Sequence, residues 1–171
     1  IELDVLDHLR AEGFNRLSMG VQDFNKQVQQ LVNREQDEAF IFALIERAKA
    51  LGFRSTNIDL IYGLPKQTPE SFAFTLQRVA ELNPDRLSVF NYAHMPNLFA
   101  AQRKIKDADL PSAQQKLDIL QQSIAFLTGA GYQFIGMDHF ARPDDELAIA
   151  QREGKLHRNF QGYTTQGDSD L

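Results

Sequence analysis

The sequence contains neither cysteine nor tryptophan. Without a thiol, the chain can form no disulfide and can hold no zinc or iron–sulfur site through thiolates of its own. It also has no signal peptide and no apolar run near the roughly 18 residues that a membrane-spanning helix requires. We therefore expect no membrane partner and a location in the cytoplasm.

Positive charge is scarce as well. The 18 Lys and Arg residues are outnumbered by 23 Asp and Glu residues, which gives a formal net charge of −5. No stripe of basic side chains is present that would displace the counterions of a phosphate backbone. The composition therefore argues against a nucleic-acid partner.

The length and the ends of the chain indicate how it is organised. With 171 residues, of which 43% are hydrophobic, the chain has enough apolar side chains for one sizeable core. It opens on Ile1 without a methionine and stops at Leu171 with no helix or strand completed. We interpret residues 1–171 as a single fragment of a longer protein.

Helical and strand patterns alternate along the chain. Apolar residues at helical spacing, with the caps Thr68 and Ser112, predict helices over 1–11, over a stretch that ends at 51, and over 68–83 and 112–129. Predicted strands cover 16–22, 57–62, 87–92 and the region of 134–138. The alternation predicts an α/β protein with parallel strands and outer helices, the C-terminal part of a partial (β/α) TIM-type barrel. Because four strands cannot close such a barrel, we expect the missing strands to lie mainly before residue 1.

Several of these strands carry polar groups. Asp59 interrupts the apolar run from Asn57 to Tyr62, and a carboxylate in a buried strand costs stability unless a partner or ligand meets it. Alternate residues of a strand share a face. We therefore predict that one face borders a single cavity, formed by Ser18, Gly20, Gln22, Asn57, Asp59, Gly136 and Asp138. The opposite face is predicted to pack on helices through Leu17, Met19, Val21, Ile58, Leu60, Ile135 and Met137.

The sequence resembles a known family along nearly its whole length. The segments GFNRLSMGVQDF, LVNR, NIDLIYGLPKQ and LSVFNYAH look like those of the oxygen-independent coproporphyrinogen III oxidases, which are radical S-adenosylmethionine (SAM) enzymes of haem biosynthesis. The later stretches YQFIGMDHFARP and NFQGYTTQ strengthen the resemblance. The resemblance implies that residues 1–171 are the second half of a radical SAM catalytic domain. It also implies a CxxxCxxC motif, which holds a [4Fe-4S] cluster and lies outside this chain.

The resemblance further implies which residues bind the cofactor. By position in the family motifs, SAM is contacted by Gln22, Arg34, Asp59 and Ala93, whereas no catalytic residue and no metal ligand is identified in this chain. These residue types suit the ligand. A carboxylate accepts from ribose hydroxyls, a guanidinium pairs with the carboxylate of the amino acid, and a small residue lets the adenine approach the backbone.

The activity implied by the resemblance is the SAM-dependent oxidative decarboxylation of coproporphyrinogen III to protoporphyrinogen IX. A 5′-deoxyadenosyl radical would take a hydrogen atom from each of two propionates, and loss of CO₂ and one electron would leave vinyl groups. The full-length protein is expected to be a monomer, and this fragment alone to be inactive. Two alternatives stay open: a haem-binding chaperone of the same family, and a barrel enzyme that uses another phosphorylated small molecule.

The histidines and the basic run carry weaker signals. His8 and His157 lie in polar settings typical of solvated side chains. His94 and His139 follow strands on the face expected to hold the site, without the close spacing of zinc ligands. The run from Arg103 to Lys106 and Arg142 either meet the carboxylates of a substrate or belong to a solvated face.

Overall fold

The computed structural model describes residues 2–159 and 162–166. Ile1 of the first predicted helix and two residues of the last motif, 160 and 161, lie outside these ranges. The helices are α1 (Leu3–Ala11), α2 (Lys26–Leu31), α3 (Glu38–Ala50), α4 (Pro69–Leu82), α5 (Ala113–Gly129) and α6 (Glu146–Arg152), with short 3₁₀ turns at Ala100–Lys104 and Asp107–Asp109. The strands are β1 (Arg16–Gln22), β2 (Ser55–Tyr62), β3 (Arg86–Asn91), β4 (Gln133–Gly136), β5 (His139–Ala141), β6 (His157–Asn159) and β7 (Gly162–Thr164).

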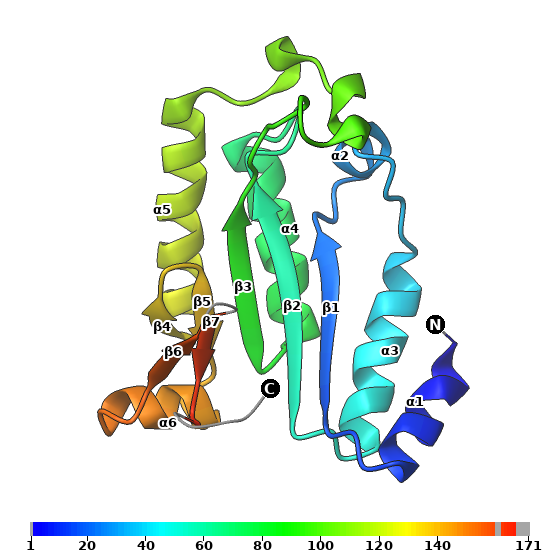
Figure 1. Cartoon of the computed structure of the whole chain (residues 1–171), viewed down its shortest axis with the longest axis vertical. Coiled ribbons are helices and arrows are strands. Elements are labelled where there is room, and N and C mark those ends of the chain that lie inside the picture. Colours follow the sequence, from blue (N-terminus) through cyan, green and yellow to red (C-terminus); the bar gives the residue numbers. More distant parts are fainter. Residues whose placement is uncertain (1, 160–161, 167–171) are drawn as a thin grey trace.

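Five strands form one sheet in the order β1-β2-β3-β5-β4, and β6 and β7 form a separate hairpin. The three long strands β1, β2 and β3 are parallel neighbours, and their carboxyl ends meet at one edge of the sheet (Figure 1). Helices α3, α4 and α5 cover one face (Figure 1). This confirms the α/β partial barrel with parallel strands and outer helices.

The fourth strand differs from the prediction. Strand β4 does not pair with β3, because the short strand β5 lies between them and runs antiparallel to both. Gly136 and Met137 have positive φ angles, so the chain reverses there and a two-residue turn joins β4 to β5. Met137 and Asp138 therefore belong to a turn and not to a strand. Met137 is 52% exposed, so the prediction that it packs on helices was wrong.

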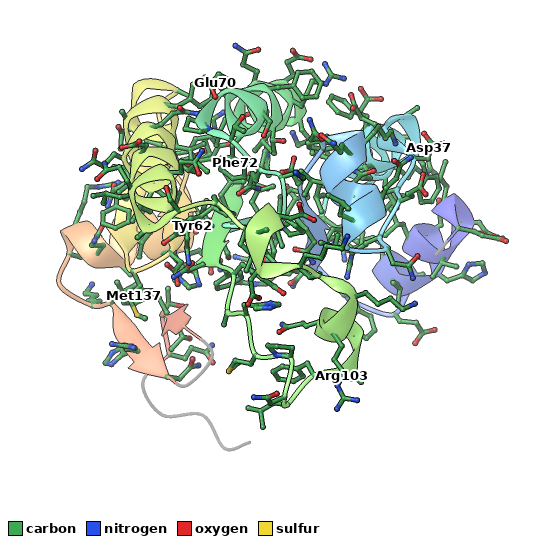
Figure 2. The ribbon with its side chains drawn as sticks, turned by 90° about the horizontal axis from the view of Figure 1, so that it is seen from above. Asp37, Tyr62, Glu70, Phe72, Arg103 and Met137 are labelled. Atoms are coloured by element: carbon green, nitrogen blue, oxygen red, sulfur yellow. The ribbon has the colours of Figure 1, made fainter. Side chains whose placement is uncertain are left out.

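The core lies between the sheet and its helices. Ile58, Leu60, Leu87 and Val89 alternate along β2 and β3 and point to the covered face, where they are fully buried. Phe72 of α4 packs against them, and it lies with Tyr62 between the sheet and the helices (Figure 2). Burying one such side chain stabilises the fold by about 1.5–3 kcal/mol. The predicted apolar face is thus confirmed for the residues of β1 and β2. It was wrong for Met137 and also for Ile135, which is buried in a separate cluster with Ala141 and with Leu147 and Ala148 of α6.

Helix ends fix the loops around this core. Thr68 caps α4 through a bond from the Ser71 amide to its hydroxyl, and Ser112 caps α5 in the same way with Gln115. Both caps were predicted from the sequence. At the opposite end of the sheet, Asp145 caps α6 and accepts the Arg86 Nε–H at 2.9 Å. This contact ties α6 to the start of β3.

Candidate functional site

The face of the sheet opposite the helices is polar. It borders a cavity of about 820 Å³, here called the sheet cavity, whose lining includes Ser18, Asn57, Asp59, Ser88 and His139. The β6–β7 hairpin forms another wall through Tyr163 and Thr164. Ser18 of β1 and Asn57 and Asp59 of β2 thus share this face, as the alternation predicted, and Ser88 of β3 lies beside them.

Asp59 is held inside this cavity by its strand neighbours. Asn57 donates a hydrogen bond from Nδ2 to Asp59 Oδ1 at 2.8 Å and another to Ser18 Oγ at 3.0 Å. The side chain of Asp59 is only partly buried. Since a carboxylate has two oxygens and about four lone-pair sites, Asp59 keeps acceptor capacity for the hydroxyl groups of a ligand.

Gln22 and Arg34 line a second hollow, at the carboxyl end of β1 and β2. This strand-end pocket has a volume of about 440 Å³ and is also lined by Ile61, Leu64 and Tyr92. Its lining is mainly apolar, and its other polar side chains are Asn33, Gln102 and Lys104. An apolar hollow with a few convergent polar groups is typical of a small-molecule site.

Gln22 has an unusual conformation. Its φ angle is 69°, and the register between β1 and β2 shifts between Gly20 and Gln22. Its side chain lies over Gly20, because a Cβ added there would be 2.8 Å from Gln22 Nε2 and 3.3 Å from Arg34 Nη2. Gln22 Oε1 is buried and has no hydrogen-bond partner within residues 2–159 and 162–166. A buried acceptor without a partner is costly, so a donor on a ligand fits this position.

Arg34 faces the same point from the loop after α2. Its Nη2 donates to the Gly20 carbonyl at 3.0 Å, and Gln36 Nε2 donates to the same oxygen at 3.1 Å. The contact places the guanidinium beside Gln22. A guanidinium has five N–H donors, so one bond to the backbone leaves several for an anionic group.

Ala93 lies in the exposed segment that follows β3. Its carbonyl accepts a bond from Gln102 Nε2 at 3.0 Å, and Gln102 lines the strand-end pocket. The segment is fastened further by His94, whose Nε2 contacts Asp107 at 3.0 Å and whose Nδ1 lies 3.0 Å from the Tyr92 hydroxyl. Ala93 is therefore near this pocket through Gln102 and does not line it directly.

The prediction of one continuous cavity was wrong. Asp59 lines the sheet cavity, while Gln22 lines the strand-end pocket, because the backbone turns at Gln22 and carries its side chain to the strand end. Both still lie on the uncovered face. Gly136 contacts the Tyr163 side chain instead, and Asp138 lies in the turn before β5.

The exposure of the histidines agrees with the expectation that His8 and His157 are solvated and that His139 lies on the site face. His8 and His157 are exposed, whereas His139 lies in the sheet cavity between the rings of Phe90 and Tyr163. Burial lowers the pKa of His139, with Asp138 and Asp59 acting in the opposite direction. In the part of the chain that the structure describes, no group of three or more His, Cys, Asp or Glu residues could hold a metal ion.

Arg103 and Arg142, two of the basic residues considered as substrate contacts, line neither the sheet cavity nor the strand-end pocket. Arg103 is exposed, donates to the Pro96 carbonyl, and lies on the segment between β3 and α5 (Figure 2). Arg142 stacks 4.1 Å above the Tyr132 ring and donates to the Ala130 carbonyl at 3.1 Å. Within the run from Arg103 to Lys106, Lys104 and Ile105 line the strand-end pocket.

Comparisons with known proteins agree with this geometry. The model of the radical SAM superfamily matches residues 1–79. The oxygen-independent coproporphyrinogen III oxidase of Escherichia coli is 87% identical over all 171 residues, and that of a Synechocystis strain is 57% identical over the same length. The solved structure of coproporphyrinogen III oxidase from Escherichia coli, described as a radical SAM enzyme, is 87% identical and superposes with a TM-score of 0.98 over the whole chain.

The chain is a close relative of the oxygen-independent coproporphyrinogen III oxidases, and its residues 1–79 carry the match to the radical SAM superfamily. It spans 37% of the length of the Escherichia coli and Synechocystis relatives, and 39% of the solved chain. The radical SAM match includes Gln22, Arg34 and Asp59 and ends before Ala93. None of the helices described here is both long and apolar enough to cross a membrane.

Sequence reasoning missed several residues that shape the site. The strand-end pocket is lined by Ile61, Tyr92 and Gln102. An apolar strand residue or a loop residue carries no sequence signal of such a role, because the role depends on how the chain folds. Asp23 was also missed. An acidic residue between Gln22 and the apolar Phe24 was a signal that could have drawn attention to it.

Proposed function

We propose that the whole protein is an oxygen-independent coproporphyrinogen III oxidase that uses SAM. Support comes from the identity of 87% along all 171 residues to a relative that carries this name. The observation that carries the proposal within the fold is the buried, unpartnered Gln22 Oε1 beside the Arg34 guanidinium, as found among the described residues. These groups complement a zwitterionic amino acid, because the amide oxygen accepts from an ammonium group and the guanidinium donates to a carboxylate.

The remaining contacts follow from the same arrangement. Asp59, in the adjoining strand, would accept from ribose hydroxyls, and the segment at Ala93 would lie against the adenine. Apolar walls such as Ile61 and Tyr92 would exclude water from the rest of the ligand. When bound, SAM supplies the adenosyl group through which radical SAM proteins remove a hydrogen atom from a substrate. In this proposal, the four side chains bind and orient SAM.

The [4Fe-4S] cluster is proposed to lie outside this chain. The sequence has no cysteine, and clusters of this type are held by cysteine thiolates. We accordingly propose that residues 1–171 form the second half of the catalytic domain, which supplies SAM contacts to a cluster held elsewhere in the protein. The protein is further proposed to act as a monomer in the cytoplasm.

The test uses the whole protein under anaerobic conditions, with reductant, SAM and coproporphyrinogen III. The proposal predicts formation of protoporphyrinogen IX with release of CO₂, and no product when SAM is omitted. A parallel titration with haemin distinguishes the related haem-binding chaperone. Tight stoichiometric haemin binding without turnover would replace the oxidase proposal by that alternative.

A further inference from the structure

A buried carboxylate lies directly behind the strand-end pocket. Asp23 follows Gln22, is 1% exposed and contacts no cationic side chain in the described ranges. Its Oδ1 accepts from the Asn25 amide at 2.8 Å and from the Thr75 hydroxyl, and its Oδ2 accepts from Gln67 Nε2 at 2.7 Å. Three donors from three segments thus converge on one side chain.

Gln67 links this carboxylate to the end of β2. Its Nε2 donates to Asp23 Oδ2 at 2.7 Å and to the Ile61 carbonyl at 3.0 Å, while its Oε1 accepts from the Gly63 amide at 2.6 Å. The Gly63 amide is a donor only, so the Gln67 amide cannot rotate without losing all three bonds. The orientation of Gln67 is therefore fixed by the backbone at the end of β2, at Ile61 and Gly63.

The backbone of Asp23 is also hydrogen-bonded to the segment that contains Arg34. The Asp23 carbonyl accepts from Gln29 Nε2 at 2.8 Å. The backbone of Gln29 in turn accepts from the Arg34 amide at 2.8 Å, and its side chain accepts from the Gln36 amide at 3.3 Å. Asp23 is thus tied to both Gln22, its neighbour in sequence, and Arg34.

Burying Asp23 has a cost. Burial raises the pKa of Asp23, and the bonds from Gln67 and Thr75 act in the opposite direction. Because all three contacts donate to the carboxylate, they match its ionised form. Moving an ionised carboxylate from water into the core costs free energy, and an apolar side chain of similar size would avoid that cost. The packing of the core therefore does not require a carboxylate at position 23.

We propose that Asp23 and Gln67 are positioning residues, which hold the turn at Gln22 and the wall at Ile61 in the geometry that binds SAM. The inference rests on the proposed function for the identity of the ligand. The Asp23–Gln67 bond joins the ends of β1 and β2 at the two positions, Gln22 and Ile61, that line the pocket. A small shift of either end would separate Gln22 from Arg34.

The test reverses one hydrogen bond in the whole protein. In Asp23→Asn, the new amide nitrogen takes the place of Oδ2 and faces Gln67 Nε2, so two hydrogen-bond donors oppose each other. In Gln67→Glu, a carboxylate oxygen takes the place of Nε2 and faces the carboxylate of Asp23, so two acceptors of like charge oppose each other. In the double variant, the amide introduced at position 23 would donate to the carboxylate introduced at position 67. This restores the bond with its direction reversed, while Oδ1 keeps both of its donors. The matched control is the exposed bond from Gln114 Nε2 to Asp118 Oδ1 at 2.8 Å on α5, exchanged in the same way.

Two readouts are compared for each variant, the dissociation constant of SAM and the thermal midpoint. A core variant, Val79→Ala, supplies a stability loss in α4 away from the pocket. We expect each single variant to weaken SAM binding about tenfold and the double variant to regain most of it, although the Ile61 carbonyl then loses its donor. The Gln114 and Asp118 variants and Val79→Ala are expected to leave the affinity for SAM unchanged.

The inference would be overturned if the single variants bound SAM as tightly as the wild type does. It would also be overturned if the loss of SAM affinity in the double variant equalled the combined losses of the two single variants. Crystal structures of Asp23→Asn and the double variant decide the matter independently of the ligand. The inference expects a displaced Gln22 in the first and a restored Gln22 in the second, and an unmoved Gln22 contradicts it. A wild-type protein that does not bind SAM would refute the proposed function, while this structural comparison would still test the positioning role.

Discussion

Gly20 lies opposite Asp59 in the register of β1 and β2, at the last paired position before the two strands shift out of step. The carbonyl of Gly20 accepts from Arg34, and its missing side chain leaves the space that Gln22 occupies. Two of the four predicted SAM contacts, Gln22 and Arg34, therefore lie against Gly20, and a third, Asp59, is its partner in the neighbouring strand.

Gly20→Ala should weaken SAM binding. The added Cβ would lie 2.8 Å from Gln22 Nε2 and 3.3 Å from Arg34 Nη2, so the Gln22 side chain must move. Gly20 does not have a positive φ angle, so the effect comes from the side chains and not from backbone strain. Isothermal titration with SAM measures it. Gly129→Ala is the control, since a Cβ there meets no atom within 4 Å, and equal affinities of the two variants would contradict the prediction.

Asp59→Asn should weaken SAM binding while leaving the visible absorption spectrum of the cluster intact. The substitution keeps the size of the side chain but turns one acceptor into a donor, which removes a charge-assisted hydrogen bond. Such a bond contributes about 1.5–3 kcal/mol, or on the order of ten- to a hundredfold in affinity. An unchanged dissociation constant would remove Asp59 from the site.

Alkaline pH should destabilise the fold through Tyr132. Burial raises the pKa of Tyr132 to about 12, although the nearby Arg142 lowers it. In the unfolded chain the phenol ionises near pH 10. Between these values the unfolded state binds fewer protons than the folded state, so the free energy of unfolding falls as the pH rises, by about 2–3 kcal/mol in all.

Thermal midpoints measured between pH 9 and pH 12 check this effect. Tyr132→Phe should lose some stability at neutral pH, because the hydroxyl donates to the Pro84 carbonyl at 2.6 Å. Its midpoint should nevertheless fall less steeply above pH 10. Parallel curves for the two proteins would show that Tyr132 is not responsible.

The chain of residues 1–171 by itself should hold no iron–sulfur cluster. It has no cysteine, and no other side chain in it replaces a set of thiolates. Reconstitution with iron and sulfide, followed by iron analysis and absorption spectroscopy, measures the cluster content. A stoichiometric cluster, or SAM cleavage by this chain alone, would contradict the account.

The long elements could be predicted from the sequence, whereas the shape of the pocket could not. The alternation of Ile58 and Leu60 with Asn57 and Asp59 correctly placed two faces on β2, because its eight residues span several periods. Strand β5 has three residues, too few to show a period, and the turn at Met137 was hidden within an apparent continuation of β4. The division into two pockets depends on the φ angle of Gln22, which no local pattern reveals.

The most direct test of the account compares two arginines in the whole protein. Both side chains are exposed, but Arg34 lines the strand-end pocket beside Gln22, whereas Arg103 does not line it. The dissociation constant of SAM, measured by titration with the cluster content held equal, should rise on the order of ten- to a hundredfold in Arg34→Ala and stay unchanged in Arg103→Ala. Equal affinities of Arg34→Ala, Arg103→Ala and the wild type would contradict the assignment of the strand-end pocket to SAM.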